Sequence, residues 1–232
     1  MSAALDPGSA GVGSRRYALG LISGHGSDPK VVLLRRLEGI DGLQRIRLNS
    51  VEPGYVTDEL IDYAAASMHF CRHLHIPLQS GDDHILRRMG RRYSTAEYGS
   101  RLQQIAAAIP GCALGADVMV GFPGETDEHH ANTRAFLDSL PLTYLHVFSY
   151  SMRDGMPAEC LPDHATPQIK TSRARDLINL GLAKRLTFHE SHIGCRVRVL
   201  TETIGDDNVA TGLTDNYLRV RYAAAPQTVS NH

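Results

Sequence analysis

The stretch Ala116-Asp117-Val118-Met119-Val120-Gly121-Phe122-Pro123-Gly124 decides the fold class of this chain. It reads as a mainly apolar strand that runs into a tight turn, because glycine and proline interrupt the run. Thr126 then stands where the N-cap of a helix belongs, and the helix continues to Leu140, where Pro141 closes it. A strand, a turn and a helix in this order predict a parallel β/α unit.

Similar units stand on both sides of this one. Further strands are expected around residues 46, 76 and 147, and helices are expected at residues 31–37, 57–67 and 94–109. The connections are long enough for crossovers, so the four strands are expected to lie parallel in one sheet or barrel. The predicted fold class is therefore α/β.

Chemistry in parallel β/α folds is placed where the strands end and the following loops begin. The polar and glycine-rich residues at these four positions are Ser50 and Glu52, Gln79 and Ser80, Gly121 to Glu125, and Ser149 to Arg153. They predict one shared site at the C-terminal rim of the strands. The alternative is that these residues are polar only because loops face solvent.

The C-terminal part of the chain has a different pattern. Residues 167–193 form one helical stretch, with Ile178, Leu182 and Leu186 in phase at i, i+4 and i+8. Beyond Gly194 the period is 2, with valines and arginines alternating in residues 195–199 and 218–222. This predicts a small antiparallel β module with four projecting arginines, namely Arg196, Arg198, Arg219 and Arg221. Such arginines either bind phosphates or face solvent, and the spacing favours neither.

Composition excludes several classes of protein. The 232 residues carry 24 basic against 25 acidic side chains, so no global charge attracts nucleic acid or membrane. No apolar stretch reaches the roughly 20 residues of a membrane span, and no signal pattern is present, so a cytoplasmic protein is expected. Residues 1–29 show no period and are expected to be disordered. The four cysteines, Cys71, Cys112, Cys160 and Cys195, stand too far apart for a local zinc or iron–sulfur motif.

Four blocks, taken together and in this order, resemble the radical-SAM methylthiotransferases. They are Arg45–Pro53, His73–Gly81, Asp117–Thr126 and His146–Ser151. The similarity extends from about Val32 to about Tyr222. Within that family, the segment Gly212–Leu218 is similar to the end module of the branch that acts on N6-threonylcarbamoyladenosine at position 37 of tRNA.

The resemblance implies a partial parallel β/α (TIM-like) radical-SAM barrel over residues 30–166, a connecting helix over 167–193 and a TRAM-like β module over 194–232. It implies 2-methylthiolation of N6-threonylcarbamoyladenosine in the tRNA anticodon loop by a monomeric enzyme. The implied cofactors are S-adenosyl-L-methionine and [4Fe-4S] clusters, which carry chemistry that side chains cannot perform.

The resemblance also implies which residues line the S-adenosylmethionine site. They are Ser50, Glu52, Gln79, Ser80, Asp117, Gly121, Gly124, Glu125, Phe148 and Tyr150. The last two are expected near the adenine, and the glycines allow the backbone to approach a flat purine closely. The alternative is that Pro123 and the two glycines only shape a tight turn. The four arginines of the β module are assigned to tRNA.

The chain departs from the family at the cluster ligands. The CxxxCxxC loop and the cysteine-bearing N-terminal domain of the family have no counterpart here, so no metal ligand or catalytic residue is assigned. We therefore expect the chain to be a truncated form of such an enzyme, inactive by itself. The alternative is a non-catalytic RNA-binding remnant. A third possibility, an unrelated barrel enzyme of the aldolase kind, is disfavoured because no lysine stands at a suitable strand end.

Overall fold

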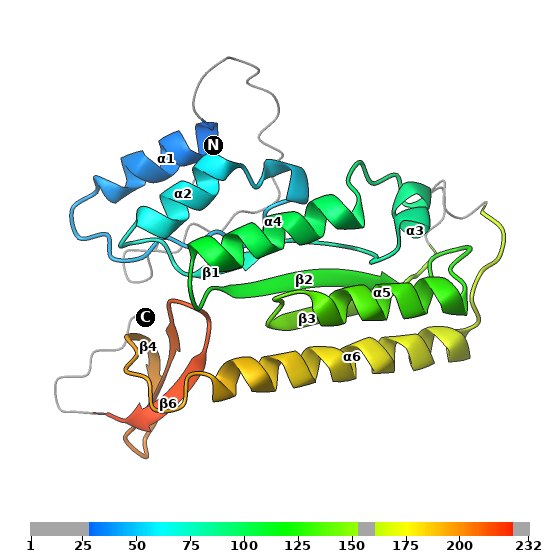
Figure 1. Cartoon of the computed structure of the whole chain (residues 1–232). Helices are drawn as coiled ribbons and strands as arrows, with labels where there is room; N and C mark the ends of the chain where they lie inside the picture. Colours follow the sequence, from blue (N-terminus) through cyan, green and yellow to red (C-terminus); the bar gives the residue numbers. More distant parts are fainter. Residues whose placement is uncertain (1–27, 153–160, 225–232) are drawn as a thin grey trace.

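The computed structural model describes residues 28–152 and 161–224, which form two connected parts (Figure 1). The larger part contains a parallel sheet in the order β1-β2-β3, made of β1 (His73–His75), β2 (Ala113–Val120) and β3 (Tyr144–Ser149). The smaller part is an antiparallel sheet in the order β4-β5-β6, made of β4 (Val199–Ile204), β5 (Val209–Thr214) and β6 (Arg219–Ala223). The predicted α/β class, with a separate small antiparallel module, is confirmed.

The helices expected at residues 31–37, 57–67, 94–109, 126–140 and 167–193 are present, and the described residues contain two further short helices that were not predicted. In chain order, the helices are α1 (Pro29–Glu38), the short 3-10 helix η1 (Pro53–Tyr55), α2 (Asp58–Ala66), α3 (Asp83–Arg88), α4 (Thr95–Ala108), α5 (Asp127–Ser139) and α6 (Pro167–Glu190). The Thr57 side chain accepts the backbone N–H of Leu60, and Ser94 and Thr126 each form a capping box. Asp28 caps α1 by accepting from the backbone of Lys30, while residues 1–27 lie outside the described residues.

The strand expected around residue 46 is reduced to a single bridge, in which Ile46 pairs in parallel with Phe70. Beyond it, residues 47–50 belong to no strand of the described structure, and the Arg47 side chain donates to the Asn49 side chain at 2.9 Å. The chain returns to the edge of β1 at Val51, whose N–H donates to the carbonyl of His75. The prediction of four full strands was therefore wrong by one.

The parallel sheet has two chemically different faces, because side chains alternate along each strand. One face is apolar and packs against the helices to form the core, and its residues include Leu74, Ile76, Leu114, Ala116, Val118 and Val120, all buried. The opposite face, here called the polar face, carries His73, His75, Asp117, Met119, Tyr144, His146 and Phe148. The helices cover the apolar face, whereas the side chains of the polar face remain available to bind a ligand.

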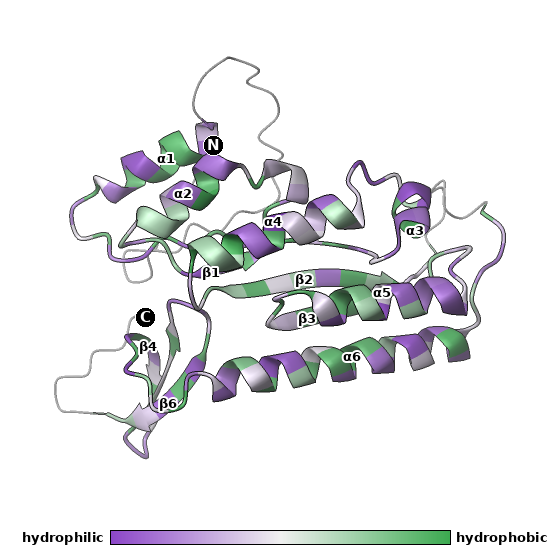
Figure 2. Ribbon diagram, viewed as in Figure 1, coloured by the Kyte–Doolittle hydropathy of each residue, from purple (hydrophilic) through white to green (hydrophobic). Residues whose placement is uncertain are grey.

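Helix α6 forms where it was expected, but its predicted apolar stripe is not its buried face. Ile178, Leu182 and Leu186 are 45%, 50% and 59% exposed, whereas the buried residues of α6 are Arg173, Leu177, Leu180 and Gly181. A Cβ at Gly181 would lie 3.1 Å from Leu145, so the glycine sets a close approach between α6 and β3. Hydrophobic and hydrophilic residues alternate along the whole of α6 in Figure 2, so the pattern alone did not indicate the packed face.

The β module also differs from its prediction at its start. Residues 195–198 were expected to open the first strand, but β4 begins at Val199. Turns follow α6 at residues 191–194, with the N–H of Cys195 donating to the carbonyl of His192, and residues 195–198 have no regular structure. The carbonyl of Arg198 accepts from the Arg45 side chain instead of a neighbouring strand. Within the two described ranges, none of the helices is long and apolar enough to cross a membrane.

Candidate functional site

The polar face runs across all three parallel strands and becomes more exposed towards their C-terminal ends. His73 and His75 are 3% and 7% exposed, whereas Phe148 is 52% exposed. Asp117 and His146 are directly paired in the register of β2 and β3, so their side chains project side by side. The exposure of the polar face therefore increases from the buried pair His73 and His75 to the exposed Phe148 at the rim.

Tyr144 holds the buried end of this face together. Its hydroxyl lies 2.8 Å from Nε2 of His73 and 3.1 Å from Nδ1 of His75. The ring can lie across β2 only because residue 115 is glycine, since a Cβ there would come within 2.0 Å of the Tyr144 ring. Burial, with smaller contributions from Arg47 and the neighbouring histidines, lowers the pKa of His73 to about 3, so His73 is neutral. Burial raises the pKa of Tyr144, which therefore keeps its proton.

The carboxylate of Asp117 contacts two histidines at the centre of the polar face. Its Oδ1 atom lies 3.0 Å from Nε2 of His75 and 3.4 Å from Nδ1 of His146. Burial by itself raises the pKa of Asp117, but the hydrogen bond and the charge of His75, with the charge of His146, hold it below the ordinary value. The carboxylate is thus ionised and oriented by two imidazoles, an arrangement that suits a cationic ligand or a hydrogen-bond donor.

Gln79 and Ser80 follow β1 but point to different partners. Gln79 is bridged to Val118 and has a φ of 74°, the left-handed region that few side chains adopt. Ser80 is only 1% exposed, and its hydroxyl lies 3.3 Å from that of Thr133 on α5 and accepts the N–H of Asp82. Ser80 therefore ties the loop to α5, and of the two residues Gln79 is the more accessible to a ligand.

The glycine-rich turn after β2 is filled by the chain's own cations. A Cβ at Gly121, whose φ is 72°, would lie 2.5 Å from the Lys170 side chain, and one at Gly124, whose φ is 83°, would lie 2.8 Å from the Arg88 guanidinium. Glu125 accepts from the N–H of Gly121 at 3.0 Å. These contacts support the interpretation that the two glycines shape the turn. The assignment of Gly121 and Gly124 to the S-adenosylmethionine site stays a prediction.

Glu125 also forms a buried ion pair with α6. Its Oε1 lies 2.7 Å from Nη1 of Arg173, and the side chains of Arg173 and Glu125 are 7% and 3% exposed. Arg173 reaches the carbonyl of Glu125 and the carboxylate of Asp127 as well. Since the carboxylate of Glu125 is already occupied, its contribution to the site is to fix the turn beneath the rim.

Three other residues that were predicted to line the site lie at the rim. Ser50 and Glu52 are exposed, and Glu52 lies 3.9 Å from Arg91. The Tyr150 ring contacts Phe122 edge-on with centroids 5.3 Å apart, and the Lys170 ammonium lies 5.2 Å from its centroid. Ser151 and Met152 complete the described part of this end, whereas Arg153 lies outside the described residues.

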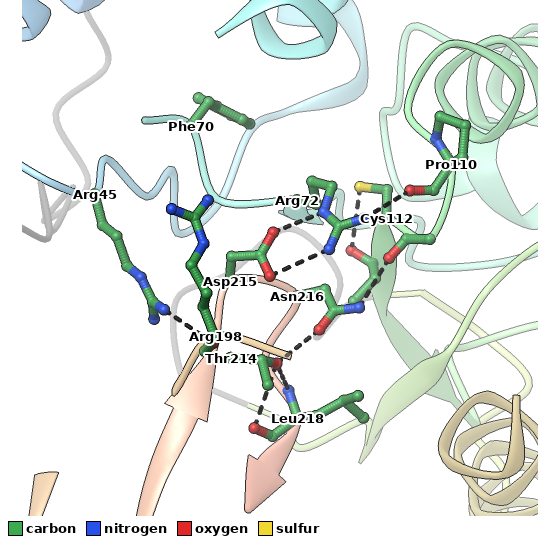
Figure 3. Close-up of polar contacts among 12 residues, drawn as sticks. Arg45, Phe70, Arg72, Pro110, Cys112, Arg198, Thr214, Asp215, Asn216 and Leu218 are labelled. Atoms are coloured by element: carbon green, nitrogen blue, oxygen red, sulfur yellow. Dashed lines mark hydrogen bonds and ion pairs between the residues drawn. The ribbon is translucent and has the colours of Figure 1, made fainter. Parts of the chain in front are cut away.

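The β module is joined to the opposite end of the sheet, before the strands begin (Figures 1 and 3). Arg72 binds Asp215 through Nε at 2.6 Å, and Asn216 donates to the carbonyl of Gly111 at 3.1 Å. Arg45 donates to the carbonyl oxygens of Leu213 and Arg198. The Tyr217 ring packs against that of His73 in a tilted arrangement, with centroids 4.6 Å apart, which extends the polar face into the module.

The four arginines assigned to tRNA are not equivalent in the structure. Arg196, Arg198, Arg219 and Arg221 are all exposed. Arg219 pairs with Glu202 at 3.1 Å, whereas Arg219 and Arg221 share one face of β6 because they alternate with Val220. Arg196 and Arg198 precede β4. The arginines thus come from two segments of one module, and their assignment to tRNA stays a prediction.

Sequence reasoning missed the residues that position the site. Tyr144, Gly115 and Arg173 were not singled out, although they orient the histidines or hold the turn. A glycine within an otherwise apolar strand was the available signal for Gly115, because it marks a close approach. His73 and His75 both form hydrogen bonds with the Tyr144 hydroxyl.

Comparison with known proteins decides the family. The sequence model of the Radical SAM superfamily matches residues 18–137. The chain belongs to this superfamily. Among solved structures, the radical SAM coproporphyrinogen III oxidase HemN from Escherichia coli superposes with a TM-score of 0.54 at 17% identity, over 80% of this chain and 48% of that one. This radical SAM chain therefore shares the fold of HemN.

Its relatives by sequence are methylthiotransferases. The chain is 37% identical to the threonylcarbamoyladenosine tRNA methylthiotransferase MtaB of Bacillus subtilis, over 85% of this chain and 46% of the relative. It is 36% identical to the tRNA-2-methylthio-N(6)-dimethylallyladenosine synthase of Desulfitobacterium hafniense, over 85% and 44%. It is 34% identical to the ribosomal protein uS12 methylthiotransferase RimO of Lachnoclostridium phytofermentans, over 78% and 42%. The radical SAM chain thus spans less than half the length of these relatives.

The cysteines that the structure describes do not fit an iron–sulfur cluster. Cys71 and Cys112 are buried, and burial raises the pKa of both thiols, that of Cys112 to about 12. A cluster ligand must be a thiolate, which such an environment opposes. Cys195 is exposed beyond the end of α6, and Cys160 lies outside the described residues. Cys71 and Cys112 are therefore unsuited to hold a cluster.

Proposed function

We propose that this chain is the rim-forming and RNA-facing part of a radical SAM tRNA methylthiotransferase that acts on N6-threonylcarbamoyladenosine at position 37. The similarity to MtaB over 85% of the chain carries the proposal. The segment Gly212–Leu218 supports the choice of branch, since it is the part that resembles the threonylcarbamoyladenosine enzymes. Because its substrate would be tRNA, we propose that the protein acts in the cytoplasm, as a monomer.

The rim and the open end of the polar face are the proposed binding site for S-adenosylmethionine. Phe148 and Tyr150 offer aromatic surface to an adenine. The carboxyl groups of Asp117, whose pKa is lowered, and of Glu52 offer acceptors to ribose hydroxyls or an ammonium group. Bound there, the cofactor would supply the radical chemistry and the methyl group. The side chains of this chain bind and orient it, while Ser80 and the Glu125–Arg173 pair keep the strand ends in place.

The β module is the proposed binding site for the tRNA backbone. It joins the sheet at the end opposite the rim, so its arginines hold the RNA at a distance from the cofactor. Contacts of arginine with phosphates fix position without reading sequence. Recognition of the modified adenosine is then left to the rim. The alternative is a non-catalytic RNA-binding remnant, in which the β module still binds RNA but the chain does not bind S-adenosylmethionine. Equilibrium dialysis with labelled S-adenosylmethionine distinguishes the two.

We expect the double variant Arg196→Ser/Arg221→Ser to weaken binding of a tRNA anticodon stem-loop about equally for cognate and unrelated sequences. Each single-strand phosphate that the variant no longer neutralises should reduce the log–log salt slope by roughly 0.7. Fluorescence anisotropy at several salt concentrations measures both quantities. The control is Arg36→Ser/Arg185→Ser, which removes the same charge from exposed positions on α1 and α6. Equal affinity and slope for the parent and the module variant would assign these arginines to solvent.

A further inference from the structure

Three potential metal ligands converge at the centre of the polar face. Nε2 of His75, Oδ1 of Asp117 and Nδ1 of His146 all lie within 4.8 Å of one another. They come from three neighbouring parallel strands, with Asp117 and His146 in register and His75 beside Gly115 on the next strand. Their relative positions are thus set by the backbone of a sheet, which holds ligands more rigidly than a loop does.

The distances within this triad suit metal coordination. Two ligand atoms that each lie about 2.0–2.1 Å from an ion at a near-tetrahedral angle are roughly 3.3 Å apart. The separations from the Asp117 oxygen are 3.0 Å to His75 and 3.4 Å to His146. Small side-chain rotations would therefore convert the hydrogen-bonded arrangement into one that surrounds an ion.

The surroundings of the triad supply the support that metal-binding histidines usually have. The remaining ring nitrogen of His75, Nδ1, lies 3.1 Å from the Tyr144 hydroxyl, which fixes the ring with Nε2 towards Asp117. Gly115 leaves the space that Tyr144 needs for this contact. The His146 side chain is 57% exposed, so an ion can approach from that side and keep solvent as a further ligand.

We propose that His75, Asp117 and His146 form a binding site for one divalent first-row transition-metal ion. Two imidazoles and one carboxylate are the ligand set that such ions accept, with positions left open for water or substrate. The site uses no cysteine and does not depend on the methylthiotransferase proposal. It lies below the rim, on the face that leads to Phe148, so a bound ion would face whatever ligand occupies that space.

Titration of the metal-free chain with Co²⁺ tests the site directly, because bound Co²⁺ has visible absorption bands that report an N/O ligand set of low symmetry. We expect one equivalent per chain with such bands, and at least a tenfold loss of affinity in both His146→Ala and Asp117→Asn. His146 is mostly exposed, so its variant should keep the parent melting curve, and circular dichroism verifies that both variants are folded.

The control for unspecific binding is His84→Ala. His84 stacks on His129 with centroids 5.1 Å apart, so it belongs to a histidine pair outside the triad. Unchanged Co²⁺ affinity in His84→Ala, with the loss in the two triad variants, is the expected result. Absence of the bands, or an equal effect of His84→Ala and His146→Ala, would overturn the proposal and leave the triad as a hydrogen-bonded cluster.

Discussion

Arg173→Ala should lower the free energy of unfolding by about 3–5 kcal/mol, the usual cost of leaving one member of a buried ion pair uncompensated. Glu125 is 3% exposed in its side chain and depends on Arg173, which also binds the backbone carbonyl of Glu125. Without the guanidinium, the buried carboxylate either keeps only the N–H of Gly121 as a partner, with its charge uncompensated, or pulls the turn after β2 open. Chemical denaturation monitored by circular dichroism measures the loss.

The matched control is Arg134→Ala, which removes an arginine from a surface pair. Arg134 and Asp176 are 47% and 39% exposed, so their pair should contribute only ~0–1 kcal/mol. The double variant Glu125→Leu/Arg173→Met should recover much of the stability lost in Arg173→Ala, because replacing both charges removes the unpaired one. Equal losses in Arg173→Ala and Arg134→Ala would contradict the structural role of the buried pair.

Gly115→Ala should destabilise the chain by about 1–3 kcal/mol, which is typical of an overpacked interior. The added Cβ would come within 2.0 Å of the Tyr144 ring, so the ring must move and give up its hydroxyl contacts with His73 and His75. Thermal unfolding gives the size of the effect.

Gly54→Ala is the control for this substitution, since nothing lies within 4 Å of a Cβ at that position. It should leave the melting temperature close to that of the parent. A Gly115→Ala protein as stable as the Gly54→Ala protein would mean that Tyr144 does not lie across β2 as described, and the orientation of His75 would lose its explanation.

The sequence was informative wherever a local signal determines the structure. Ser94 and Thr126 predict their helices because a capping hydroxyl and the residue three positions later satisfy the free backbone groups. The strand at residues 116–120 was recognisable from its apolar run and the glycines that follow, although β2 already begins at Ala113. The strand at residue 46 was overpredicted, because four apolar and basic residues in alternation do not show whether a neighbouring strand will pair with them.

The candidate site was only partly predictable, because its geometry depends on contacts between distant segments. The blocks 117–126 and 146–151 identified the right strand ends, and the register of β2 and β3 then brings Asp117 beside His146. Nothing local shows that Arg173, 48 residues beyond Glu125, will occupy its carboxylate. The exposed stripe Ile178, Leu182 and Leu186 likewise shows that periodicity finds a helix without identifying its packed face.

We propose that this chain supplies the rim and the RNA-binding module of a tRNA methylthiotransferase. The most direct measurement joins the chain to the N-terminal part of B. subtilis MtaB, in place of the matching region, in cells that lack their own MtaB. Mass spectrometry of tRNA nucleosides should then detect 2-methylthio-N6-threonylcarbamoyladenosine, and a Phe148→Ala chimera should form less of it. A soluble chimera that leaves threonylcarbamoyladenosine unmodified, in cells where intact MtaB modifies it, would contradict the account.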